Sequence, residues 1–225
     1  MLRTILFFGV LLGTISLFAQ KSSGFSVVGG IDYLFRVNRP AYLSADEDPH
    51  RHFRLGVNYD RRFAEKWWFV TGLRLTHFRF DTGEKDPPTN FAYVPNTFGD
   101  TNLTLADYAE GYRWRETDLY VEIPFSLRYF PRTKGSFYLE GGAAVNFYLT
   151  TFSRMDLGSR RLRSWSRDSS GSFDHLLPSV QIGAGWQWQT NRNQYLIIQP
   201  KFRYFFPFYN NFSMFSGGVE IGYRW

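Results

Sequence analysis

The feature that most constrains this chain is a twelve-residue stretch, 119–130, with the sequence LYVEIPFSLRYF. Its odd-numbered positions are all apolar or aromatic, whereas its even-numbered positions are largely polar and carry both signs of charge. This period-two alternation predicts a β-strand with one apolar and one polar face. Strands of soluble proteins usually run about five or six residues, and a strand that crosses a bilayer needs about 9–11. The stretch is therefore long enough to cross a membrane.

The first twenty residues have a different pattern. Arg3 precedes an apolar run from Ile5 to about Leu17, and the small residue Ala19 follows. This order is typical of a secretory signal peptide, with cleavage near Ala19 or Gln20. The alternative is an N-terminal transmembrane helix, but the run is shorter than the roughly 20 apolar residues that such a helix needs. We predict a signal peptide at 1–20 and one domain at 21–225.

Composition narrows the class of the mature domain. No second apolar run approaches the length of a spanning helix, and only closed barrels allow strands to satisfy their backbone hydrogen bonds in lipid. The chain has 24 Phe, 14 Tyr and 7 Trp, which suits an outward apolar band with aromatic girdles. It has no cysteine, which weakens the case for a disulfide scaffold. The net charge of +6 suits anionic lipid headgroups, and export disfavours nucleic acid as the partner.

Seven further segments alternate in the same way, so the sequence predicts an all-β, eight-stranded antiparallel transmembrane β-barrel. These segments are 25–36, 53–63, 67–80, 137–149, 179–189, 195–205 and 214–225. Long connections at 81–115 and 150–177 alternate with short ones, which places short turns in the periplasm and long loops outside the cell. Pro124 and Pro200 fall inside strands, where we expect a bulge or a local break in the ladder.

Ten charged residues lie on the polar faces of these strands. Eight strands enclose little more than their own side chains, so these charges must mostly pair with one another. They could line an ion path or form a structural polar core, and the small strand number favours a plugged core. The ten residues are Asp32, Arg54, Asp60, Arg74, Glu122, Arg128, Glu140, Lys201, Arg203 and Glu220.

A second cluster lies in the predicted external loop 150–177. It combines five arginines with one tryptophan: Arg154, Arg160, Arg161, Arg163, Trp165 and Arg167. Arginine suits bidentate contacts with phosphate, so lipopolysaccharide headgroups are a candidate partner. The alternative is an ordinary solvated loop.

No motif for a cofactor or metal stands out. The chain has no P-loop, no dinucleotide-binding glycine turn and no metal-spaced His/Asp cluster. His50, His52, His77 and His175 all fall near the predicted external rim. A lipid A hydrolase or acyltransferase at that rim would need such a histidine paired with a serine or an acid. We expect no catalytic residue, cofactor or metal, and keep the lipid A-modifying enzyme as an alternative.

The stretch YVEIPFSLRYF and the final aromatic residue, Trp225, resemble the PorT-like outer-membrane β-barrel family of Bacteroidota. Its members pair a Glu-Ile-Pro strand, as at 122–124, with a strand similar to Tyr-Leu-Glu-Gly-Gly at 138–142. The resemblance covers the whole mature chain through short motifs. It implies an eight-stranded barrel in the outer membrane of a Gram-negative bacterium, without implying one activity. One namesake of the family belongs to a gliding and secretion apparatus, so a subunit of a secretion or motility complex is an alternative.

The function that the sequence predicts is a non-enzymatic integral outer-membrane barrel that acts as a membrane anchor or interaction module through its external loops. Its expected partners are outer-membrane lipid and lipopolysaccharide, the barrel assembly machinery during insertion, and a protein at the external loops or periplasmic turns, but no nucleic acid. The predicted C-terminal insertion signal is Val219, Ile221, Tyr223 and Trp225.

Overall fold

The computed structural model of the chain describes residues 23–37, 50–85, 112–132, 136–157, 160–166, 175–206 and 213–225. The predicted signal peptide at 1–20 lies outside these residues. The described strands are β1 (Ser23–Val37), β2 (His50–Ala64), β3 (Trp67–Lys85), β4 (Tyr112–Tyr129), β5 (Phe137–Leu157), β6 (Arg160–Ser166), β7 (Leu176–Asn191), β8 (Gln194–Phe205) and β9 (Ser213–Arg224). No helix in the described part of the chain is long and apolar enough to cross a membrane.

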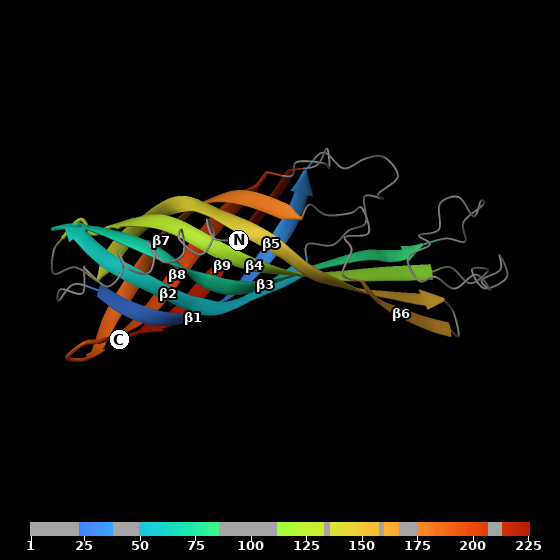
Figure 1. Cartoon of the computed structure of the whole chain (residues 1–225), viewed down its shortest axis with the longest axis horizontal. Coiled ribbons are helices and arrows are strands. Elements are labelled where there is room, and N and C mark those ends of the chain that lie inside the picture. Colours follow the sequence, from blue (N-terminus) through green and yellow to red (C-terminus); the bar gives the residue numbers. More distant parts are fainter. Residues whose placement is uncertain are drawn as a thin grey trace, which may run out of the picture.

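Eight of these strands close on themselves. The hydrogen-bonded order runs β1, β2, β3, β4, β5, β7, β8, β9, and β9 pairs with β1 again. Every neighbouring pair is antiparallel. The ribbons in Figure 1 wind around one common axis. The predicted closed, eight-stranded antiparallel barrel is confirmed.

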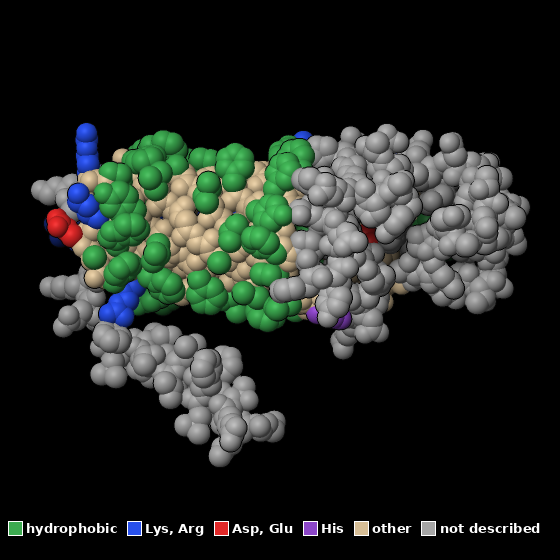
Figure 2. Space-filling view, turned by 90° about the horizontal axis from the view of Figure 1, so that it is seen from above, with side chains coloured by type: hydrophobic (Ala, Val, Ile, Leu, Met, Phe, Trp, Pro, Cys, Tyr) green, Lys and Arg blue, Asp and Glu red, His purple; other side chains and the backbone are tan. Residues whose placement is uncertain are grey.

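The outer wall of the barrel carries an apolar band, and charged side chains lie at its two edges. On β2, the outward positions between Arg51 and Arg61 are Phe53, Leu55, Val57 and Tyr59. Phe53, Leu55 and Val57 are exposed, and exposed Phe, Leu, Ile, Val and Trp side chains recur around the wall. Figure 2 shows hydrophobic side chains spread around the face of the barrel. A contiguous exposed apolar surface of this extent is the signature of contact with lipid.

The short turns lie together at one end of the barrel. Glu65 and Lys66 join β2 to β3, and Arg192 and Asn193 join β7 to β8. The chain ends there as well, because Trp225 exchanges backbone hydrogen bonds of 3.0 and 3.2 Å with Phe25 at the start of β1. Figure 1 shows the C-terminus at this end. We call it the short-turn end and the opposite one the long-connection end.

At the long-connection end the structure corrects the predicted loops. β3 continues to Lys85, β4 already begins at Tyr112, and β5 continues to Leu157 and pairs with β6. These four strands project beyond the barrel as a sheet, which we call the extension (Figure 1). The prediction of loops over 81–115 and 150–177 was wrong for these parts. Residues outside the bilayer can be polar on both faces of a strand, so the apolar alternation disappears while the backbone pairing continues.

Pro124 and Pro200, the two prolines predicted to interrupt strands, each coincide with a ladder break on one side. Between β3 and β4, the bridge Thr71↔Phe125 is followed by Arg74↔Glu122 in the same register, so Pro124 has no bridge to β3. Between β7 and β8, Gly183↔Lys201 is followed by Trp186↔Ile198, so Pro200 has no bridge to β7. Each proline lacks an N–H donor, and the interruption accommodates that loss without shifting the register.

An irregularity between β4 and β5 decides which residues of the extension face outward. Leu119 pairs with Thr150, but Tyr120 pairs with Tyr148, so β5 carries one extra residue there. In β5 the buried residues before this point in the sequence are even-numbered, and those after it are odd-numbered. A bulge reverses the alternation of a strand in this way. Arg154 and Asp156 consequently lie on the outward face of the extension.

Candidate functional site

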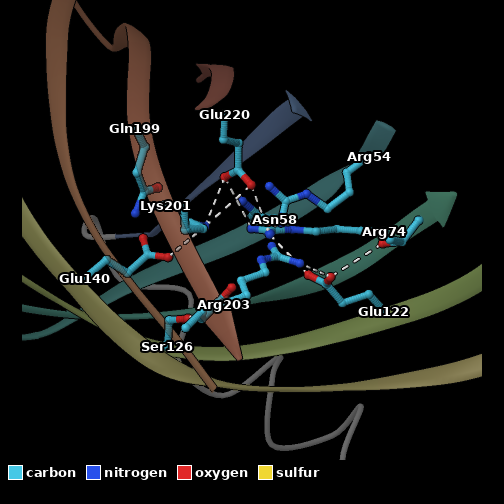
Figure 3. Close-up of polar contacts among 12 residues, drawn as sticks. Arg54, Asn58, Arg74, Glu122, Ser126, Glu140, Gln199, Lys201, Arg203 and Glu220 are labelled. Atoms are coloured by element: carbon cyan, nitrogen blue, oxygen red, sulfur yellow. Dashed lines mark hydrogen bonds and ion pairs between the residues drawn. The ribbon is translucent and has the colours of Figure 1, made fainter. Parts of the chain in front are cut away.

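The ten charged residues of the polar parity all lie buried inside the barrel, each no more than 5% exposed. Seven of them form a continuous chain of ion pairs. Along this chain the order is Arg203, Glu122, Arg74, Glu220, Lys201, Glu140 and Arg128. Figure 3 shows six of these side chains converging from different strands. Each carboxylate in the chain contacts two cations, so opposite charges alternate along it.

Several of these contacts cross the lumen. Arg74 of β3 lies 3.0 Å from Glu220 of β9, although β2 and β1 separate those strands in the ladder. Arg203 of β8 pairs with Glu122 of β4 across β5 and β7. Lys201 lies 3.1 Å from Glu140 and 3.3 Å from Glu220. The charged side chains therefore tie opposite walls of the barrel together.

Neutral polar side chains join the same layer. Gln181 of β7 donates to the Ser126 hydroxyl at 2.6 Å, and Tyr138 of β5 donates to Gln199 of β8 at 3.3 Å. Arg74 also donates to the Asn58 side-chain oxygen at 3.0 Å. These partners were not predicted from the sequence. They share the inward parity with the charged residues, which was the signal available.

The remaining three of the ten predicted charges form two separate pairs, one of them with Arg224. Asp32 of β1 accepts a hydrogen bond of 2.8 Å from Arg54 of β2. Asp60 of β2 lies 2.6 Å from Arg224 of β9, near the short-turn end. The Arg224 guanidinium also sits 4.2 Å from the centre of the Trp68 ring, which gives it a cation–π contact.

Apolar layers lie on both sides of the charged layer, and the sequence analysis missed both. Toward the long-connection end the buried cluster is Leu34, Phe78, Tyr120, Leu177, Phe205 and Met214, with Tyr148 packed against it. Toward the short-turn end it is Phe130, Tyr138 and Ile197, with Trp68. All of these residues are on the inward parity. They lie next to the charged side chains along the barrel axis.

The predicted arginine cluster lies on the outward face of the extension and includes further residues. β6 and β5 place Arg163 beside Arg154, which is beside Arg115 of β4 and then Asp81 of β3. The next row, which lies farther from the barrel along the strands, contains Arg161, Asp156 and Arg113. We call these two rows the arginine rows. The side chain of Arg160 and the whole of Arg167 lie outside the described residues.

Two carboxylates hold the arginines of these rows in place. Asp81 accepts hydrogen bonds of 2.8 and 2.9 Å from Arg113 and of 2.8 Å from Arg115. Asp156 lies 2.9 Å from Arg154 and 2.8 Å from Arg161. Burial alone would raise the pKa of Asp156, but hydrogen bonds from Arg154 and Arg161 outweigh it and lower that pKa below its ordinary value. Arg113, Arg115 and Asp81 were assigned to a loop by sequence, because both parities of 112–118 (YRWRETD) carry polar residues.

An aromatic pair separates the arginine rows from the apolar wall. Phe152 of β5 and Trp165 of β6 are directly paired and their rings stack, with centroids 6.2 Å apart and planes 8° apart. Both side chains are exposed, Phe152 at 45% and Trp165 at 61%. Trp165 also donates to the Thr150 hydroxyl. Exposed aromatics at this boundary are typical of a membrane–water interface.

The structure describes the side chains of three of the four histidines, His52, His77 and His175. His52 is buried, with Nδ1 3.1 Å from the carbonyl oxygen of His77, and its ring packs near Phe78. His175 is exposed and stands edge-on to Tyr148. The His50 side chain lies outside the described residues. Within the described ranges, no group of three or more His, Cys, Asp or Glu side chains could hold a metal ion.

The four residues of the predicted insertion signal share the outer face of β9 and the chain end. Val219, Ile221, Tyr223 and Trp225 are all exposed, at 40% or more. Their role in insertion stays a prediction.

Comparisons with known proteins give likeness to solved barrels only. No protein-family model matches the chain. No curated protein matches it either. Among solved structures, the chain is similar to Neisserial surface protein A at 14% identity and a TM-score of 0.41, covering 91% of this chain and 98% of that one.

Two further solved structures show the same weak likeness. The attachment invasion locus protein Ail of Yersinia pestis, in complex with the heparin analogue sucrose octasulfate, matches at 12% identity and a TM-score of 0.39, over 91% of this chain and 98% of that one. The outer membrane protease OmpT of Escherichia coli matches at 8% identity and 0.41, over 91% and 95%. The closed ladder and the apolar wall, rather than these similarities, make this chain a transmembrane β-barrel of the outer-membrane type.

Proposed function

We propose that the chain is a non-enzymatic integral protein of the Gram-negative outer membrane, with a plugged lumen, that anchors the extension at the cell surface. The observation that carries this proposal is the contrast between the two sides of the wall. The outer side is apolar and exposed, and the inner side carries a chain of ion pairs between two apolar layers. An apolar exterior suits lipid, while an interior spanned by side chains leaves little space for solute passage.

The proposed orientation places the short-turn end in the periplasm and the extension outside. An even-stranded barrel brings both chain ends to one side, which in bacterial outer-membrane barrels is the periplasmic side with the short turns. The outward aromatics of β9, which end at Trp225, would then serve as the insertion signal for the barrel assembly machinery.

Heat-modifiable migration tests the membrane-barrel part of this proposal. Without boiling, the folded barrel is expected to migrate differently in a detergent gel from the boiled protein. Only detergent should extract it from membranes. Release of the mature protein by a salt or carbonate wash would contradict the proposal.

A second candidate is a subunit of a secretion or motility complex, as the PorT-like resemblance suggests. The extension supports it, because four paired strands project beyond the wall and offer a surface to a protein partner. Crosslinking in native membranes followed by purification decides between the two. A defined partner recovered in fixed ratio supports the complex, and a lone monomer supports the independent anchor.

The third candidate, a lipid A-modifying enzyme at the rim, draws its support from the histidines alone. His52 is buried beside Phe78, which leaves the exposed His175 as the better placed of the two. Mass spectra of lipid A from cells with and without the gene test it. Identical spectra remove this candidate.

A further inference from the structure

We propose that the arginine rows on the outer face of β4, β5 and β6 bind the phosphate groups of a lipopolysaccharide molecule in the surrounding outer leaflet. This inference rests on the proposed function, since it requires the barrel in the outer membrane with the extension outside. It names a lipid partner for the arginine rows, which contain five arginines and two aspartates. These are Arg113, Arg115, Arg154, Arg161, Arg163, Asp81 and Asp156.

The first argument is the height of the rows on the wall. Leu119 is the last apolar outward position of β4, and the next one, Thr117, pairs with Phe152, which pairs with Trp165. One step further along each strand come Arg115, Arg154 and Arg163. The surface thus changes from aliphatic to aromatic to cationic over two successive side-chain positions. A lipid whose acyl chains cover the wall would bring its phosphates to this level.

The second argument is charge. The two carboxylates are outnumbered by the arginines, and Arg163 has no ion-pair partner among the described residues. The side chains of Arg113 and Arg161 remain 39% and 54% exposed even though each contacts an aspartate. The surface therefore keeps a positive excess on partly exposed side chains, which an anion of the membrane can approach.

The third argument is geometry. Neighbouring strands lie about 4.8 Å apart, and successive side chains on one face lie roughly 6.6–6.8 Å apart along a strand. Adjacent arginines such as Arg154 and Arg163 can therefore share one phosphate, and the second row can reach another. Guanidinium forms parallel hydrogen bonds to phosphate oxygens, and Asp156 fixes the plane of the Arg154 guanidinium before a ligand arrives.

The continuity with the apolar wall favours a lipid over a soluble polyanion. A soluble sulfated or phosphorylated sugar could reach the arginines, but it has no acyl chains to cover the apolar wall on the other side of the exposed Phe152–Trp165 stack. A phosphorylated glycolipid can contact the apolar wall, the aromatic pair and the arginines at once. Lipopolysaccharide is the outer-leaflet lipid with that combination.

The test measures binding of lipopolysaccharide to the purified, folded full-length barrel in detergent. The probes are intact lipopolysaccharide, the same material after enzymatic removal of its phosphates, and soluble heparin. The test variant is R154Q/R163Q, and the matched control is R132Q/R192Q, which removes the same charge from exposed positions at the short-turn end. Heat-modifiable migration is recorded for every preparation, so that a folding defect is recognised separately.

The expected result is a loss of affinity of about tenfold or more for R154Q/R163Q, since charged hydrogen bonds to phosphate are lost, and a change within about twofold for the control. Dephosphorylated lipopolysaccharide should bind the native barrel as weakly as intact material binds R154Q/R163Q. Equal affinity of R154Q/R163Q and the native protein, or equally tight binding of heparin and lipopolysaccharide, would overturn the inference. If the protein is heat-modifiable but binds no lipopolysaccharide, only this inference is contradicted. If carbonate releases the protein from membranes, the proposed function is contradicted.

Discussion

The chain uses the same ionic chemistry in two places that differ in their contact with water. Inside the barrel, Glu122 is fully buried between Arg74 and Arg203. On the extension, Asp156 bridges Arg154 and Arg161, but these three side chains keep 26%, 32% and 54% of their surface exposed. Pairing is thus common to both regions, and burial separates them. A lost partner leaves an uncompensated charge inside, whereas outside water or a ligand replaces it.

The largest expected effect is the loss of one interior carboxylate. Glu122→Gln keeps the volume of the side chain but leaves the buried Arg203 without its carboxylate, at a cost of about 3–5 kcal/mol in the free energy of unfolding. The double variant E122Q/R203M should recover much of this loss. Urea unfolding of the barrel in detergent measures both. A loss of stability in E122Q below about 1 kcal/mol, the contribution of an exposed ion pair, would contradict the proposed exclusion of water from the lumen.

Moving a charge by one residue takes it to the other side of the wall. Ile123 lies on the lipid-facing parity next to Glu122, so Ile123→Arg should cost roughly 2–4 kcal/mol near the bilayer midplane. Adding R203M should not rescue this variant, because the new charge faces lipid rather than Arg203. Unfolding in lipid vesicles measures the cost. Rescue by R203M would show that residue 123 faces inward.

Gly185 and Gly141 allow the inner and outer sides of the barrel wall to be compared without changing any charge. A Cβ on Gly185 would overlap the buried ring of Tyr138, whereas the nearest atom to a Cβ on Gly141 would be the Gln181 backbone oxygen, 4.0 Å away. Gly185→Ala should therefore destabilise the barrel by about 1–3 kcal/mol through overpacking. Gly141→Ala should stay within about 0.5 kcal/mol. Similar unfolding midpoints for the two variants would mean that the interior is loosely packed.

The smallest effect is expected on the extension and depends on pH. The arginines lower the pKa of Asp156 in the folded protein, so its contribution to stability is present above its unfolded pKa and is lost as pH falls through the lower folded value. As an exposed pair it should contribute no more than about 1 kcal/mol. The stability difference between the native protein and D156N should shrink on acidification below pH 4. A difference that grows instead would reverse the assigned direction.

The sequence was most informative where the bilayer and the narrow lumen constrain it. Alternation located all eight barrel strands and the inward side of each, because lipid on one face and the lumen of the barrel on the other require opposite side chains. It missed the strand residues at 81–85, 112–118, 150–157 and 160–166, where both faces are outside lipid and no apolar alternation is required.

The partners of individual charges could not be predicted either. The pairing of Arg74 with Glu220 and of Arg203 with Glu122 depends on which strands face each other across the lumen. That geometry follows from closure and tilt rather than from local pattern. The change of parity in β5 was equally hidden, since the bulge between Leu119 and Tyr120 appears only in the pairing with β4.

A lumen closed by side chains is the central proposal for this molecule. Planar-bilayer recording of the purified, heat-modifiable barrel tests this most directly. The ion pairs that cross the lumen and the apolar layers on either side of them predict no stable, large conductance. Steady currents of porin size would contradict the closed interior.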